Sequence, residues 1–78
     1  MKAKVKFKNI DDLIWFTATT NNLHGDINLM DGRIVCDAKS LVALLNLDLS
    51  KVFGLELISE DEEDIEIFNQ LKERYALK

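Results

Sequence analysis

The nucleophilic side chains of interest in this 78-residue sequence are its single histidine, His24, its single cysteine, Cys36, and one of its serines, Ser40. A neutral imidazole nitrogen can attack and carry a phosphoryl group, and a serine hydroxyl can accept a phosphate. A thiol reacts as the thiolate, which needs a neighbouring base or cation. The sequence shows no such partner for Cys36, so we expect a small packed apolar side chain there. His24 and Ser40 are therefore the residues with candidate chemistry.

Ser40 stands just before a short apolar run over 41–47, where a helix N-cap belongs. Its hydroxyl oxygen can accept a hydrogen bond from a backbone N–H of the first turn, and this structural role alone accounts for the serine. Upstream, Asp31-Gly32 predicts the centre of a tight primed hairpin turn, with a returning strand over 33–37. The middle of the chain is thus predicted to be a hairpin, a cap and a short helix.

The N-terminal third predicts a strand followed by a helix. Ala3, Val5 and Phe7 alternate with four lysines, which we expect to solvate the outer face of a strand. Asn9 or Asp11 can cap a helix that runs to about residue 21 or 22. The buried face of this helix is predicted from the spacing of Leu13, Phe16, Thr17 and Thr20.

The C-terminal third predicts a strand over 51–59 and a final helix. Ser59, with Glu62 three residues later, fits a capping box, so we expect Ser59 to cap this helix. The acidic run over 60–64 then has a structural explanation at the helix N-terminus, and we expect no metal site there. Apolar residues at spacings of three and four follow: Ile65, Phe68, Leu71 and Tyr75.

Composition limits the class of protein. The chain is 47% hydrophobic and 31% charged, as expected for one small globular domain over residues 1–78. A net charge of −4 argues against a nucleic-acid partner. The sequence has neither a run of about 20 apolar residues nor a signal peptide pattern, so we expect no membrane association. A single cysteine fits a reducing cytoplasm, and no cofactor is expected.

The predicted order is strand, helix, strand, strand, helix, strand, helix (βαββαβα). Each helix has one apolar face, and an antiparallel sheet can bury one face while the other contacts water. We therefore predict an α+β open-faced sandwich, with a four-stranded antiparallel sheet covered on one face by three helices.

The run Ala38-Lys39-Ser40-Leu41, with a hairpin before it and an apolar short helix after it, resembles the central part of HPr. HPr is the small phosphocarrier of the bacterial phosphoenolpyruvate:sugar phosphotransferase system. In element order the resemblance covers nearly the whole chain. It implies an HPr-like sandwich with sheet order 1-4-2-3.

The resemblance fails at the phosphorylation loop. HPr carries its phosphoryl group on a histidine between the first strand and first helix, followed closely by an arginine and a proline. Here the corresponding connection, over 8–12, is shorter and contains none of these residues. Asp11 and Asp12 place negative charge where the phosphoryl anion would sit, which costs about 1–4 kcal/mol per close pair. We therefore expect a divergent member without the active-site histidine loop.

His24 does not fill that gap. Only six residues separate it from the Asp31-Gly32 turn, too few for both a helix and a strand. We expect His24 to lie on the surface after the first helix, and phosphocarrier activity through His24 or Ser40 remains the alternative function. The family resemblance also implies that Ser40 is a candidate for regulatory phosphorylation, whereas its role as a plain cap remains the simpler explanation.

A protein-binding surface is the leading functional hypothesis. Leu44 and Leu47 suffice for the core face of the short helix, so other apolar residues should be partly exposed, on the surface where the family docks its partners. Trp15 either anchors a partner there or folds over the edge of the core. We expect a regulatory or homodimeric domain, not an enzyme, with a phosphotransferase-system enzyme or a transcription regulator as partner. The interface candidates are Ile14, Trp15, Leu41, Val42 and Leu45.

Overall fold

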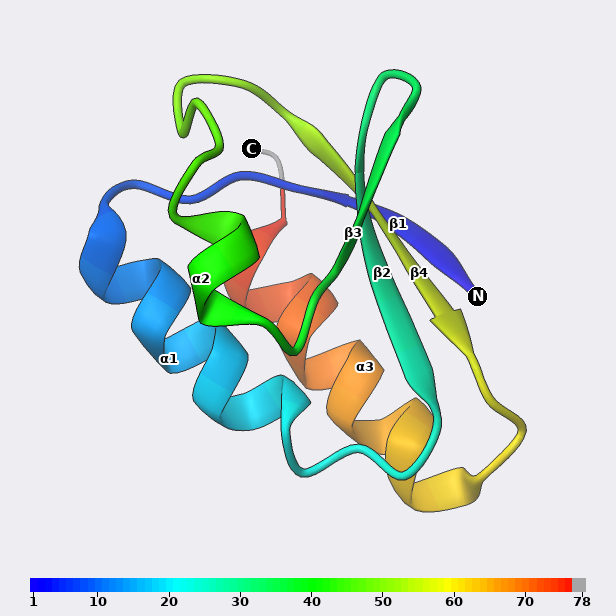
Figure 1. Cartoon of the computed structure of the whole chain (residues 1–78). Coiled ribbons are helices and arrows are strands. Elements are labelled where there is room, and N and C mark those ends of the chain that lie inside the picture. Colours follow the sequence, from blue (N-terminus) through cyan, green and yellow to red (C-terminus); the bar gives the residue numbers. More distant parts are fainter. Residues whose placement is uncertain (77–78) are drawn as a thin grey trace.

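A computed structural model describes residues 1–76, and its elements follow the predicted order (Figure 1). The strands form one antiparallel sheet in the order β1-β4-β2-β3, as the HPr resemblance implied. All three helices cover the same face of this sheet (Figure 1), which confirms the predicted α+β open-faced sandwich. The elements are β1 (Lys2–Val5), α1 (Ile10–Thr20), β2 (Asp26–Asp31), β3 (Ile34–Asp37), α2 (Leu41–Leu44), β4 (Phe53–Ile58) and α3 (Glu62–Tyr75).

The core lies between the sheet and the helices. Alternate residues of β4 point inward, and the predicted face of α1 is buried in the same core. Phe7 lies at the centre of an aromatic group, with its ring centroid 5.0 Å from that of Phe16 and 5.2 Å from that of Tyr75. Cys36 is half-buried and packs against the core, as predicted. Within residues 1–76, no helix is both long and apolar enough to span a bilayer.

Two local predictions were wrong. The hairpin turn is centred on Gly32-Arg33, one residue later than predicted, because Asp31 pairs with Ile34 in the ladder. Only Gly32 has a positive φ, of 59°, which is the arrangement expected when glycine occupies the first central position of a type II′ turn. The loop therefore has two residues, and only the first of them needs the positive φ that glycine adopts readily.

The second error concerns the cap of α3. Asp61, not Ser59, is the N-cap: its carboxylate accepts hydrogen bonds from the amides of Glu63 and Asp64 at 2.8 and 3.2 Å. The Ser59 hydroxyl instead donates to the carboxylate of Asp64, which is fully buried. Ser59 is thus engaged inside the fold, and the helix begins at Glu62.

Candidate protein-binding surface

Helix α1 begins with two reciprocal side-chain contacts. The Asn9 side chain accepts a hydrogen bond from the Asp12 amide at 3.0 Å, which makes Asn9 the N-cap. The Asp12 carboxylate accepts one from the Lys8 amide at 2.8 Å. The carboxylate charge also complements the positive end of the helix dipole. Backbone donors at this end of α1 are therefore bound by side chains of the chain itself.

The other end of α1 fixes the position of α2. Buried Thr20 donates through its hydroxyl to the Ala38 carbonyl at 2.8 Å, and Asn21 donates through its amide to the Lys39 carbonyl at 3.0 Å. Ser40 then caps α2, since its hydroxyl oxygen accepts from the Ala43 amide at 3.4 Å. The predicted cap role of Ser40 is confirmed, and these contacts hold the start of α2 against the end of α1.

The short helix presents the most exposed apolar side chains of this region. Val42 is 76% exposed and Leu45 is 48% exposed, while Leu44 is buried. Leu41 is half-buried and packs against the core, so only part of it is open. Two of the three predicted interface residues of this segment are thus clearly accessible.

Ile14 extends this apolar region onto α1. It is 47% exposed and lies seven residues, or about two helical turns, before Asn21. Because Asn21 contacts the Lys39 carbonyl, this flank of α1 faces the α2 side. Ile10, four residues before Ile14 and also exposed, shares the flank, although sequence reasoning missed it. We call Ile10, Ile14, Val42 and Leu45 the helical surface.

Trp15 belongs to a different flank. Its side chain is 61% exposed, so the alternative that it folds over the core was wrong. The Arg74 guanidinium lies 5.4 Å from the centroid of the Trp15 ring, a cation–π distance. Trp15 also lines a shallow groove between α1 and α3, together with Thr19, Gln70, Leu71, Glu73 and Arg74. The five predicted interface residues therefore divide between two neighbouring flanks.

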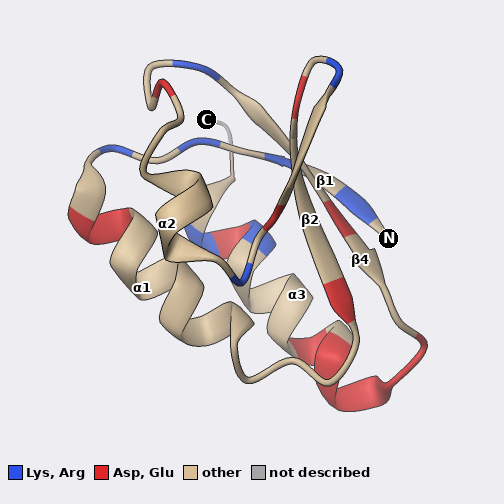
Figure 2. Cartoon of the chain, viewed as in Figure 1, with Lys and Arg blue, Asp and Glu red and all other residues tan. Residues whose placement is uncertain are grey.

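A cleft of about 910 Å³ lies beside the connection between β1 and α1. Its lining includes three cations, Lys6, Lys8 and Arg74, against one carboxylate, Asp12. Sequence reasoning counted the two aspartates but missed these cations, which come from separate parts of the chain. Figure 2 shows the acidic residues concentrated instead around the β4–α3 connection and the start of α3, with basic residues along β1 and near the end of α3.

Tyr75 lies in the same cleft and contributes a perturbed phenol. Burial raises the pKa of Tyr75 and the charge of Asp12 adds to that rise, while Arg74 opposes both effects. Tyr75 is therefore a neutral, uncharged member of the cleft wall at neutral pH. No histidine lines the cleft within the described residues.

His24 lies at the far end of α1 from this cleft, in the turn before β2. Its side chain is exposed, as predicted, with Nε2 3.4 Å from a carboxylate oxygen of Glu63. The backbone amides of His24 and Gly25 donate to the two carboxylate oxygens of Asp64 at 2.9 and 2.8 Å. The backbone amides next to His24, which could otherwise bind an anion, are thus occupied by the carboxylate of Asp64.

Asp64 is ionised in this setting. Burial alone would raise the pKa of its carboxyl, but the hydrogen bonds from His24, Ser59 and Gly25 together outweigh that effect and lower the pKa below its ordinary value. A fully buried carboxylate with these three donors connects the α1–β2 turn to the start of α3. Asp64 therefore has a structural role: it holds the α1–β2 turn against the start of α3.

No protein-family model matches the sequence, and no curated protein matches it. Among solved structures, the crystal structure of HPr-C-His from Thermoanaerobacter tengcongensis aligns over 100% of this chain and 98% of that chain, with a TM-score of 0.74 and 17% sequence identity. The fold is therefore HPr-like. At this identity the likeness concerns the fold alone.

Proposed function

We propose that this chain is an HPr-like, non-catalytic domain that binds a protein partner of the phosphotransferase system through its helical surface. The observation that carries the proposal is the exposure of Val42, Leu45 and Ile14 on two neighbouring helices, which the Thr20 and Asn21 contacts position against each other. Exposed apolar side chains gathered on adjacent elements usually mark an interface. Trp15 offers a second anchor on the neighbouring flank.

Four features support binding rather than phosphoryl transfer. The cleft beside the start of α1 has cations but no nucleophilic histidine within the described lining. His24 lies beyond the other end of α1, an eleven-residue helix of about 16 Å. The amides next to His24 already bind Asp64. A phosphoryl group on His24 would also meet the carboxylate of Glu63.

The binding test uses two partners of stated class: the first enzyme of a phosphotransferase system, and a transcription regulator that recognises HPr. Each is titrated into the labelled chain while amide resonances are followed by NMR. We expect shifts at α1 and α2 for one of them. Val42→Asp should weaken that binding about tenfold or more, because it places a charge in an apolar contact.

Ile58→Asp is the matched control. Ile58 is as exposed as the residues of the helical surface but belongs to the open face of the sheet. It should leave binding unchanged. If neither partner binds, or if the two variants weaken binding equally, the helical surface is not the interface.

The alternative function is a phosphocarrier with an atypical acceptor. Incubation with phosphoenolpyruvate and the first enzyme, followed by intact mass measurement, should give no phosphoryl gain under our proposal. A gain that disappears in His24→Gln would establish the carrier function instead. A serine kinase of the system provides the regulatory test, because modification at the α2 cap must be lost in Ser40→Ala.

A further inference from the structure

Strand β3 is an edge of the sheet, because β2 is its sole neighbour within residues 1–76. An unpaired edge offers backbone donors and acceptors to another strand. Two apolar side chains on this edge are open to solvent: Ile34 is 59% exposed and Val35 is 60% exposed. The edge thus combines free backbone groups with apolar surface, and none of its residues belongs to the helical surface.

The backbone direction along β3 follows from the hairpin register. The Ala38 amide donates to the Ile27 carbonyl at 3.0 Å, so this pair is hydrogen-bonded. Hydrogen-bonded and non-bonded pairs alternate in an antiparallel ladder, so Cys36 and Ile34 also point their backbone groups toward β2. The N–H and C=O of Val35 consequently point outward, toward the free edge.

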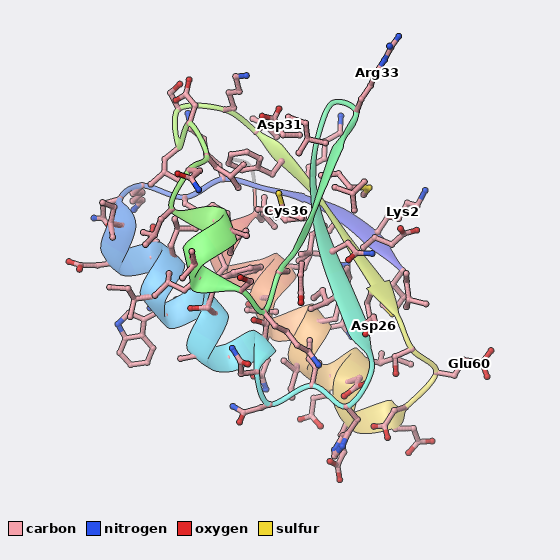
Figure 3. The ribbon with its side chains drawn as sticks, viewed as in Figure 1. Lys2, Asp26, Asp31, Arg33, Cys36 and Glu60 are labelled. Atoms are coloured by element: carbon pink, nitrogen blue, oxygen red, sulfur yellow. The ribbon has the colours of Figure 1, made fainter. Side chains whose placement is uncertain are left out.

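The side chains of this edge are self-complementary. If a second β3 pairs antiparallel with Val35 opposite Val35, then Arg33, the turn residue just before β3, falls opposite Asp37 at both ends. Ile34 likewise falls opposite Cys36 on the inner face. Arg33 extends into solvent from the hairpin tip (Figure 3), and it has no ion-pair partner within 4 Å among the described residues. Opposite charges in directly opposed positions favour strand pairing.

We propose that β3 pairs with β3 of a second copy of this chain, about a two-fold axis at Val35. A two-fold interface requires one patch to match itself, which the sequence from Arg33 to Asp37 does in charge and in apolar content. The two sheets become one eight-stranded sheet with all helices on the same face. On the open face, Val35 and Met30, which is opposite it in β2, would form one apolar strip with Val35 and Met30 of the second copy.

Sedimentation velocity across the micromolar to millimolar range tests this pairing. Wild type should show reversible dimerisation, and Arg33→Asp should weaken it about tenfold or more, because two attractive cross-strand pairs become repulsive. Asp37→Arg should weaken it likewise. An equimolar mixture of the two variants should dimerise again, since unlike charges then face each other at both ends.

Asp37 also accepts a hydrogen bond from the Lys39 amide at 2.9 Å, so Asp37→Arg could disturb the turn before α2. Val35→Pro provides a second test, because the only backbone donor that it removes is the outward N–H, and an edge strand tolerates proline at such a position. It should abolish dimerisation while circular dichroism stays that of wild type. A monomer at every concentration overturns the proposal, as does a dimer that survives Val35→Pro.

The control variant separates this inference from the proposed function. Val42→Asp lies on the helical surface and should leave the dimer intact. A dimer lost in Val42→Asp and kept in Arg33→Asp would place self-association on the helices and overturn β3 pairing. Partner binding through the helical surface is tested separately, by the NMR titration, and does not depend on whether the dimer forms.

Discussion

Replacing Thr20 by valine removes one hydroxyl at the contact that positions α2. The hydroxyl donates to the carbonyl of Ala38, a fully buried residue just before the short helix, at 2.8 Å. Valine has nearly the same shape and a similar helix propensity, so packing and intrinsic helix stability change little. The hydroxyl also lies 3.1 Å from the Thr17 carbonyl, but that carbonyl keeps two donors from Asn21. The acceptor that the substitution leaves without a donor is therefore the Ala38 carbonyl.

The cost of this change follows from the acceptor left behind. A buried carbonyl that loses its donor costs about 1–3 kcal/mol. For a domain of this size, each kcal/mol lowers Tm by roughly 4–8 °C, so Thr20→Val should lower Tm by roughly 5–20 °C. The loss should also loosen α2, and with it the spacing of Val42 and Leu45 from Ile14.

Urea denaturation followed by circular dichroism measures the free energy of unfolding, with Thr19→Val as the matched control. Thr19 precedes Thr20 on the same helix, but its hydroxyl donates to the Trp15 carbonyl at an exposed position. Water can replace that donor, so Thr19→Val should change stability by no more than about 0.5 kcal/mol. Equal effects of the two variants would refute the role assigned to the Thr20 contact.

Three further predictions concern other contacts. Because the pKa of Asp64 is lowered in the folded protein, its carboxylate stabilises the fold fully above the ordinary value of 3.8, and this contribution is lost as the pH falls through the folded pKa. Urea unfolding at decreasing pH should show that loss in wild type and a flatter profile in Asp64→Asn; identical profiles would contradict the ionised anchor. Gly25→Ala should lower the free energy of unfolding by about 1–3 kcal/mol, since an added Cβ would lie 2.7 Å from the Cβ of Ser59; wild-type stability in urea would show that the turn has room. Arg74→Ala should raise acrylamide quenching of Trp15 fluorescence while changing stability by no more than about 1 kcal/mol, because the cation–π contact is exposed; unchanged quenching would mean that Arg74 does not cover the indole.

Local sequence rules predicted the caps of α1 and α2 but failed for α3, and the reason is physical. Ser59 and Asp61 are each followed three residues later by an acidic side chain, so the capping rule fits both. The choice depends on Asp64, whose partners His24 and Gly25 lie 40 and 39 residues away. A contact between residues so far apart in the sequence cannot be predicted from the local sequence pattern.

The interface candidates show the same limit. Exposure of Val42 and Leu45 was predictable, because a short helix within 41–47 needs few core positions, although the observed helix ends already at Leu44. Ile14 and Trp15 were grouped together, yet adjacent helical residues point about 100° apart. Which flank meets α2 and which meets α3 depends on tertiary packing. The resemblance to HPr supplied the sheet order, which periodicity alone does not determine.

Backbone amides that could bind a phosphoryl anion already bind carboxylates of the chain itself, which argues against the alternative function as a phosphocarrier. The Lys8 amide binds Asp12, and the amides of His24 and Gly25 bind Asp64. A phosphoryl anion would have to displace a carboxylate that is held in place by the fold and, for Asp64, fully buried. Breaking such a buried, multiply bonded carboxylate away from its donors is strongly unfavourable. If His24 nevertheless becomes phosphorylated by the first enzyme, the amides beside it must exchange Asp64 for the phosphoryl oxygens, and the NMR shifts of His24 and Gly25 would reveal that exchange.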